Sequence, residues 1–145
     1  MPELNNHNFN HLKIHTQYSI CEGAIKIDNL KDFCKEKKIP CLGISDTSNL
    51  CGALEFAENI SKVGTQPIIG TQIYFRFEDT TGLLPLIALN ENGYKRIIEL
   101  SSRSYLENDA LSDPHLDVKD LLIDTEGVSL LSGTIQGLFG KLFEK

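Results

Sequence analysis

The sequence contains no tryptophan, and its aromatic side chains are limited to 7 Phe and 4 Tyr. This scarcity argues against a base-stacking platform, in which aromatic side chains stack on successive bases of a single strand. Basic residues are also few, since 14 Lys and Arg stand against 20 Asp and Glu and give a formal net charge of −6. Nucleic-acid binding needs a surplus of Lys and Arg to neutralise phosphates, so we expect no direct nucleic-acid binding by this chain.

Long apolar runs are missing as well. No segment approaches the roughly 18–20 consecutive apolar residues of a transmembrane helix, so we expect no membrane partner. The first residues, Met-Pro-Glu-Leu-Asn-Asn-His, have neither the basic region nor the apolar core of a signal peptide. Together these observations favour a cytoplasmic protein.

Paired cysteines are absent too. The chain has 4 cysteines and no C-x-x-C pair, which argues against a zinc knuckle or a disulfide framework. We expect reduced and mostly buried thiols at Cys21, Cys34, Cys41 and Cys51.

What is present suffices for one folded domain. The chain has 145 residues, of which 41% are hydrophobic and 23% are charged, a composition that can bury a core. The last residues carry the apolar pairs Leu138-Phe139 and Leu142-Phe143 without a polar finish. We therefore expect residues 1–145 to be the N-terminal part of a longer chain.

Short apolar runs alternate with helical stripes along the sequence. The pattern predicts strands at 12–16, 41–45, 67–76, 84–89 and 128–131. It predicts helices at 27–38, 52–63, 90–105, 118–123 and 134–145, with a polar loop at 107–114. Asp28 and Asn90 are candidate N-terminal caps, and Gly64 is a candidate C-terminal cap. This alternation is typical of βαβ units, so we expect an α/β fold with mainly parallel strands.

Functional side chains follow the predicted strands. His11, Lys13 and His15 share one face of the first strand because side chains alternate along a strand. Polar residues also follow the second strand at 43–49 and lie in the third at 69–72. Sites in parallel α/β folds lie at the carboxyl ends of strands, and a His-x-His pair there can seat a divalent metal.

The same segments resemble a known family. The motifs are HLKIHTQYS, EGA, ISDTSNLCGALEF, PIIGTQIYF, NENGYKRIIELSSRSY and GVSLLSG. Their order and spacing are similar to those of the polymerase-and-histidinol-phosphatase (PHP) domain. More narrowly, they resemble the version at the N-terminus of bacterial replicative DNA polymerase III alpha subunits. The resemblance implies the first part of a distorted seven-stranded β/α barrel.

The resemblance also implies a ligand set, because family members with an intact site hold several divalent metals and hydrolyse phosphoesters. The family's ligand positions fall here on Lys13, His15, Glu22, Asp46, Thr47, Gln72 and Leu83. Only His15, Glu22 and Asp46 keep a side chain that could bind metal in the family's manner. We therefore expect no catalytic residue, no metal ligand and no cofactor in this chain, and a vestigial cleft instead.

Lysine in place of an imidazole has a further effect, because a protonated lysine only donates hydrogen bonds and its charge repels a cation. We expect the Lys13 ammonium to pair with Glu22 or Asp46, although Lys13 could also be an exposed edge residue. Each of the three retained ligand positions has two interpretations. His15 is either a hydrogen-bonded cleft histidine or a metal ligand. Asp46 is either a turn or capping group or a catalytic base, and Glu22 is either a turn residue or a cleft acid.

Two functions from different classes follow. The first is a metal-free structural and interaction module within a DNA-directed DNA polymerase, a nucleotidyltransferase of DNA replication. Its partners would be the rest of the polymerase chain and, by resemblance, the proofreading exonuclease subunit, while the polymerase elsewhere in the parent chain would use Mg. The alternative is a metal-dependent phosphoesterase or 3′–5′ proofreading exonuclease of the PHP family, against which Lys13, Thr47, Gln72 and Leu83 count.

Overall fold

The computed structural model describes residues 9–144. The residues used in the signal-peptide argument lie outside this range. Lys145, at the end of the last expected helix, lies outside it too. The helices are α1 (Ile27–Lys37), α2 (Ala53–Ser61), α3 (Glu91–Leu106), α4 (Val118–Leu122) and α5 (Leu138–Phe143). The strands are β1 (Cys41–Thr47), β2 (Gln66–Phe77), β3 (Thr80–Ala88), β4 (Leu116–Asp117) and β5 (Val128–Leu130).

The strands form one mixed sheet in the order β1-β2-β3-β5, with β4 paired to β2. β1 and β4 run parallel to β2, while the long β2–β3 ladder and the β3–β5 ladder are antiparallel. The expectation of mainly parallel strands is therefore wrong. β2 and β3 are joined by a tight turn in which Glu78 has a positive φ of 52°, and such a turn leaves no room for a crossover helix. The sheet does not close within residues 9–144, so the expected first part of a seven-stranded barrel is not confirmed and stays a prediction.

The first expected strand, 12–16, is also not a strand. It makes only isolated bridges, from Ile14 to Ile44 and from Thr16 to Ile25. Two backbone hydrogen bonds tie it to β1, from the Gly43 and Ser45 amides to the carbonyls of His11 and Ile14, at 2.7 and 2.8 Å. The segment therefore runs beside β1 without a continuous ladder.

The helices agree well with the periodicity, although some caps differ. Asn90 caps α3 as expected, since its side chain accepts a hydrogen bond from the Gly93 amide. In α1 the N-cap position is Lys26, and Asp28 lies in the first turn, so Asp28 is not the N-cap. In α2 the C-cap position is Lys62, and Gly64 follows two residues later with a φ of +80°. Only 138–143 of the expected last helix is helical. The 107–114 loop has no helix or strand, as predicted.

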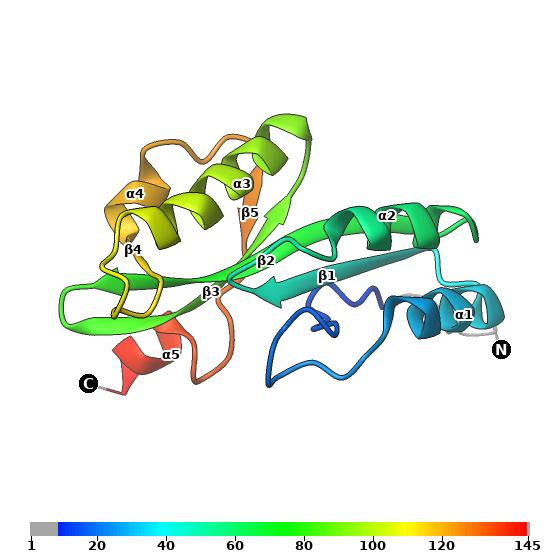
Figure 1. The fold of residues 1–145 in the computed structure, drawn as a ribbon, viewed down its shortest axis with the longest axis horizontal. Coiled ribbons are helices and arrows are strands. Elements are labelled where there is room, and N and C mark those ends of the chain that lie inside the picture. Colours follow the sequence, from blue (N-terminus) through cyan, green and yellow to red (C-terminus); the bar gives the residue numbers. More distant parts are fainter. Residues whose placement is uncertain (1–8, 145) are drawn as a thin grey trace, which may run out of the picture.

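The elements enclose two apolar clusters. One is formed by α1, β1 and α2, and its fully buried members include Phe56, Leu42 and Ile44. The other lies around the β2–β3 hairpin, with α3 and α4 on one side and α5 on the other (Figure 1). A Cβ on Gly82 would lie 2.5 Å from the Leu138 backbone, so α5 packs directly on β3.

The cysteines are only partly as expected. All four thiols are free, but Cys34 alone is buried, Cys41 is half-buried, and Cys21 and Cys51 are exposed. The expectation of mostly buried thiols is therefore wrong, because Cys21 and Cys51 lie in turns rather than in the helix and strand that hold the other two. Burial raises the pKa of the Cys34 thiol, which disfavours its reactive thiolate.

Candidate functional site

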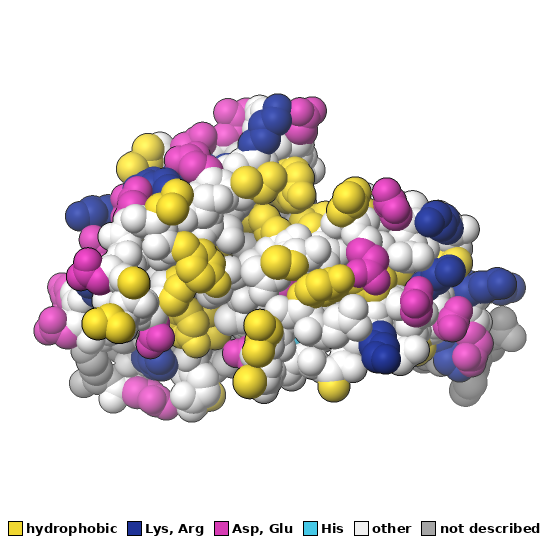
Figure 2. Space-filling view, viewed as in Figure 1, with side chains coloured by type: hydrophobic (Ala, Val, Ile, Leu, Met, Phe, Trp, Pro, Cys, Tyr) yellow, Lys and Arg dark blue, Asp and Glu magenta, His cyan; other side chains and the backbone are white. Residues whose placement is uncertain are grey.

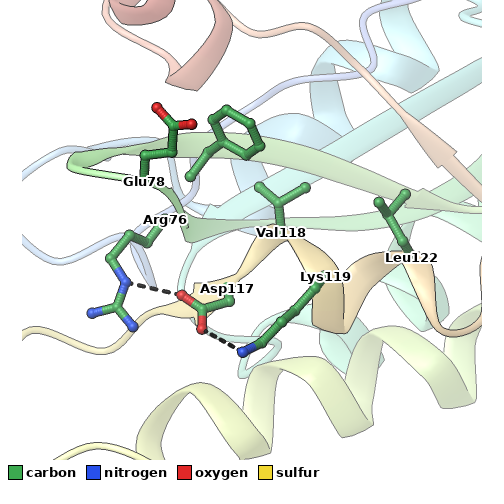
Figure 3. Close-up of a pocket in the computed structure, with 7 residues that line it drawn as sticks. Arg76, Glu78, Asp117, Val118, Lys119 and Leu122 are labelled. Atoms are coloured by element: carbon green, nitrogen blue, oxygen red, sulfur yellow. Dashed lines mark hydrogen bonds and ion pairs between the residues drawn. The ribbon is translucent and has the colours of Figure 1, made fainter.

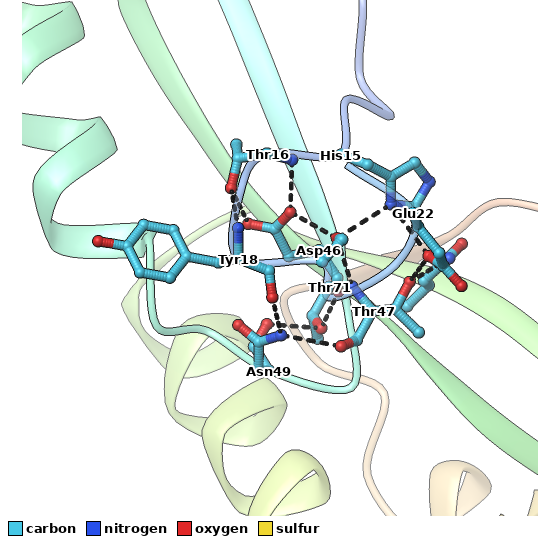
Figure 4. Close-up of polar contacts among 10 residues, drawn as sticks. His15, Thr16, Tyr18, Glu22, Asp46, Thr47, Asn49 and Thr71 are labelled. Carbon is cyan, nitrogen blue, oxygen red and sulfur yellow. Dashed lines mark hydrogen bonds and ion pairs between the residues drawn. The ribbon is translucent and has the colours of Figure 1, made fainter. Parts of the chain in front are cut away.

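A polar network lies where β1 ends, and the Asp46 carboxylate is its centre (Figure 4). Asp46 is 1% exposed. One carboxylate oxygen accepts from the Thr16 amide at 2.6 Å and from the Ser19 hydroxyl at 2.7 Å. The other accepts from the Thr16 hydroxyl at 2.7 Å. Neutral donors therefore satisfy both oxygens of this buried carboxylate, as a buried polar group requires.

A second arm of the network contains more of the predicted residues. The Thr47 hydroxyl donates to Glu22, and the Gln72 amide nitrogen donates to Thr47 Oγ1 at 2.7 Å. His15 Nδ1 lies 3.3 Å from the Ser19 hydroxyl and 3.8 Å from Glu22 Oε2. The structure therefore brings together His15, Glu22, Asp46, Thr47 and Gln72.

The backbone explains why these residues meet. Thr47 and Gln72 are direct partners in the parallel β1–β2 register. The segment before α1 folds back so closely that a Cβ on Gly23 would lie 1.9 Å from the Thr16 carbonyl oxygen, so only glycine fits there. This turn places Ser19 and Glu22 beside the end of β1.

The predicted Lys13 ion pair is wrong. Lys13 is half-buried, and within the described residues it lies within 4 Å of neither the Glu22 nor the Asp46 carboxylate. Thr16 and Ser19 donors already occupy both Asp46 oxygens, and Glu22 accepts from the Thr47 hydroxyl instead. Leu83 does not join the network either, since it pairs with Tyr74 on β2 and bridges Gly137.

The donors do not fit a cluster of divalent metals. Among residues 9–144, no three His, Cys, Asp or Glu side chains lie together in a way that could hold a metal ion. Asp46 is committed to hydroxyl and amide donors, and Thr47, Gln72 and Leu83 bring no charge or imidazole. The expectation of no metal and no catalytic residue remains a prediction about the protein in solution.

Sequence reasoning missed the neutral members of the network. The Thr71 hydroxyl donates to the Asp46 and Asn49 carbonyls, and Asn49 donates to the Tyr18 and Thr47 carbonyls. The Tyr18 hydroxyl donates to Glu55 at 2.6 Å, and this hydrogen bond raises the pKa of Tyr18. The sequence did contain one signal for these partners, since Asp46 lies among Ser and Thr residues. A carboxylate buried at the end of a strand needs hydrogen-bond donors nearby, and Ser and Thr side chains can supply them.

A separate cavity of about 410 Å³ lies between the end of β2 and the β4–α4 segment, and ion pairs line it (Figure 3). Arg76 Nε and Lys119 Nζ lie 2.9 and 3.2 Å from the two Asp117 oxygens. The hydrogen bond from Arg76, with a smaller effect of Lys119, holds the pKa of Asp117 below its ordinary value. Both cations that line this cavity are therefore paired with Asp117, and we keep the Asp46 network as the candidate site.

Comparison with known proteins decides the family. The family model for the PHP domain matches residues 11–145. The chain belongs to the PHP-domain family. This PHP domain is 36% identical over 152 residues to DNA polymerase III subunit alpha of Caulobacter vibrioides, covering 99% of this chain and 13% of that protein. The Rickettsia felis protein of the same name is 35% identical over 134 residues, covering 92% of this chain and 11% of that protein.

The fold of this PHP domain is also found in a solved structure. An amidohydrolase from Chromobacterium violaceum, determined with bound sulfate and no metal, matches with a TM-score of 0.54 at 14% identity. The match covers 67% of this chain and 33% of that chain, and at this identity it shows the fold alone. Within residues 9–144, no helix has the length and apolar character needed to cross a membrane.

Proposed function

We propose that this PHP domain is a non-catalytic structural and protein-interaction module of a DNA polymerase III alpha subunit, acting in DNA replication in the cytoplasm. The observation that carries the proposal is the identity of 35–36% over nearly the whole chain to proteins of that name. The chain spans only 11–13% of the length of these relatives. We infer that nucleotide transfer and the Mg it uses belong to other parts of such a polypeptide.

The Asp46 network supports the non-catalytic part of the proposal. A carboxylate that acts as a base or holds a cation needs an oxygen free to meet a substrate proton or an ion. Both Asp46 oxygens are buried and accept from Thr16 and Ser19 donors. The site is thus suited to holding backbone segments together.

Charge supports protein partners over nucleic acid. The net charge is −6, and on the face in Figure 2 basic side chains alternate with acidic ones around the edge while hydrophobic side chains gather in the middle. We infer that the partners are the rest of the polymerase chain and the proofreading exonuclease subunit, with no direct contact to DNA.

The interaction is tested by co-purification. An alpha polypeptide that carries this domain is compared with one that lacks residues 1–145, and retained nucleotide incorporation shows that the shortened polypeptide is folded. We expect recovery of the exonuclease subunit to fall at least about tenfold, which corresponds to about 1.4 kcal/mol of binding free energy. Equal recovery by both would contradict the interaction role.

The non-catalytic role is tested on the purified 145-residue chain. We expect no stoichiometric zinc or manganese and no hydrolysis of a generic phosphodiester, also in Lys13→His, because a multi-metal site needs several ligands together. Chelator-sensitive hydrolysis that disappears in His15→Ala would overturn this role in favour of a metal-dependent phosphoesterase. Ser102→Ala, on the exposed side of α3, is the matched control.

A further inference from the structure

The N-terminal segment lies on the edge of β1 that β2 does not use. We call residues 11–23 the strap. It is joined to β1 by the two backbone hydrogen bonds from Gly43 and Ser45, whereas β1 and β2 share a continuous ladder from Cys41–Gln66 to Thr47–Gln72. A Cβ on Gly43 would lie 2.8 Å from Leu12 Cα, so the strap rests directly on the strand backbone.

Apolar contacts hold the strap only lightly. Ile14 and Tyr18 pack at the margin of the α1–β1–α2 cluster and are only partly buried. Ile20, in contrast, is 85% exposed. Apolar burial scales with the area removed from water, so this segment gains less from it than the helices do.

Side-chain hydrogen bonds supply most of the attachment, and we call them the clasp. Asp46 accepts three hydrogen bonds from Thr16 and Ser19. The Thr47 amide donates to the Ser19 hydroxyl at 3.1 Å, and the Thr47 side chain donates to Glu22. Hydrogen bonds to a carboxylate are roughly twice as strong as neutral ones, so Asp46 is the main holding group.

We propose that the strap opens as a unit from an otherwise folded domain, and that the Asp46 clasp sets how often it opens. Opening breaks the two backbone hydrogen bonds to β1 and exposes the Gly43 and Ser45 amides on the β1 edge. It also breaks the hydrogen bonds that join Tyr18 to Glu55 and Asn49. The β1–β2 and β2–β3 ladders stay paired because none of their hydrogen bonds involves the strap. This inference stands independently of the proposed role in a polymerase.

Amide hydrogen exchange in the 145-residue chain tests the proposal. Thr16→Val keeps the shape of the side chain and removes its hydroxyl, and Asp46→Asn removes the charge. In both variants we expect exchange at Gly43 and Ser45 to accelerate at least about tenfold, which corresponds to about 1.4 kcal/mol. Exchange in the β2–β3 ladder should stay at the wild-type rate, and Asp32→Asn, on the exposed face of α1, should change neither.

Two results would overturn the proposal. Wild-type exchange at Gly43 and Ser45 in Thr16→Val would mean that the clasp does not hold the strap. Equal acceleration in the β2–β3 ladder would mean that the strap does not open separately from the domain. Should Asp46→Asn fail to fold, Thr16→Val decides alone.

Discussion

Single residues show how far a family pattern predicts contacts. The resemblance located His15, Glu22, Asp46, Thr47 and Gln72, and the structure brings them together. It could not locate Thr16 and Ser19 as their partners, because hydroxyl donors are common and their spacing carries no chemistry. The predicted Lys13 ion pair was wrong because backbone geometry decides which donor reaches a buried carboxylate. The pattern of charges in the sequence does not encode that geometry.

The Asp117 ion pair carries a pH dependence. Because the hydrogen bond from Arg76 lowers the folded-state pKa of Asp117, the pair stabilises the fold above the unfolded-state pKa, near 3.8. This contribution is lost as the pH falls through the folded-state pKa. We therefore expect Asp117→Asn to lower the free energy of unfolding at pH 6–7, and the difference from wild type to shrink below about pH 4.

Urea unfolding at a series of pH values measures this difference. The effect is small because the pair is partly exposed, with side-chain exposures of 47% for Arg76 and 30% for Asp117. Asp109→Asn, in the exposed loop after α3, is the matched control and should show no such pH dependence. A difference for Asp117→Asn that is constant from pH 7 to pH 3 would refute the ion-pair contribution.

At the scale of elements, α3 depends on its cap. Asn90 Oδ1 accepts from the Gly93 amide at 2.9 Å and satisfies one of the donors that a helix leaves free at its start. We expect Asn90→Ala to lower the free energy of unfolding by about 1 kcal/mol in chemical denaturation. Asn90→Asp, which keeps an acceptor, should recover most of this loss.

Asn92→Ala is the control for the cap. Asn92 is exposed in the first turn of the same helix, and its substitution should change stability by no more than about 0.5 kcal/mol. Equal losses at the two positions would mean that the cap contributes nothing specific.

Helices and strands were not equally predictable. The period of apolar residues located α1 to α4 because the buried face of a helix leaves a direct trace in the sequence. Strand direction leaves no such trace, and it depends on the connection. Here the connection between β2 and β3 is a turn at 78–79, too short for the dozen or more residues that a parallel pair requires. Connection length was therefore the better guide to strand direction.

At the scale of the whole molecule, motif order identified the family where individual motifs could not. The motifs lie on the strap, β1, α2, β2, α3 and β5, so their sequence order follows the path of the chain through the two apolar clusters. A family model that matches residues 11–145 confirms that reading. The direction of the strands and the completeness of a barrel depend on pairings that this order does not specify.

The β2–β3 hairpin has a consequence for the order in which native contacts form. Its two strands are adjacent in sequence, so their pairing closes a short loop at little entropic cost. The hydrogen bonds from Thr71 and Thr16 to Asp46 join residues 25 and 30 positions apart, and they require β1 to be in place. We expect the hairpin to pair early and the N-terminal segment to dock last, although the ribosome makes that segment first. Until docking, β1 presents an unpaired edge, which is the surface of a newly made chain most open to wrong partners.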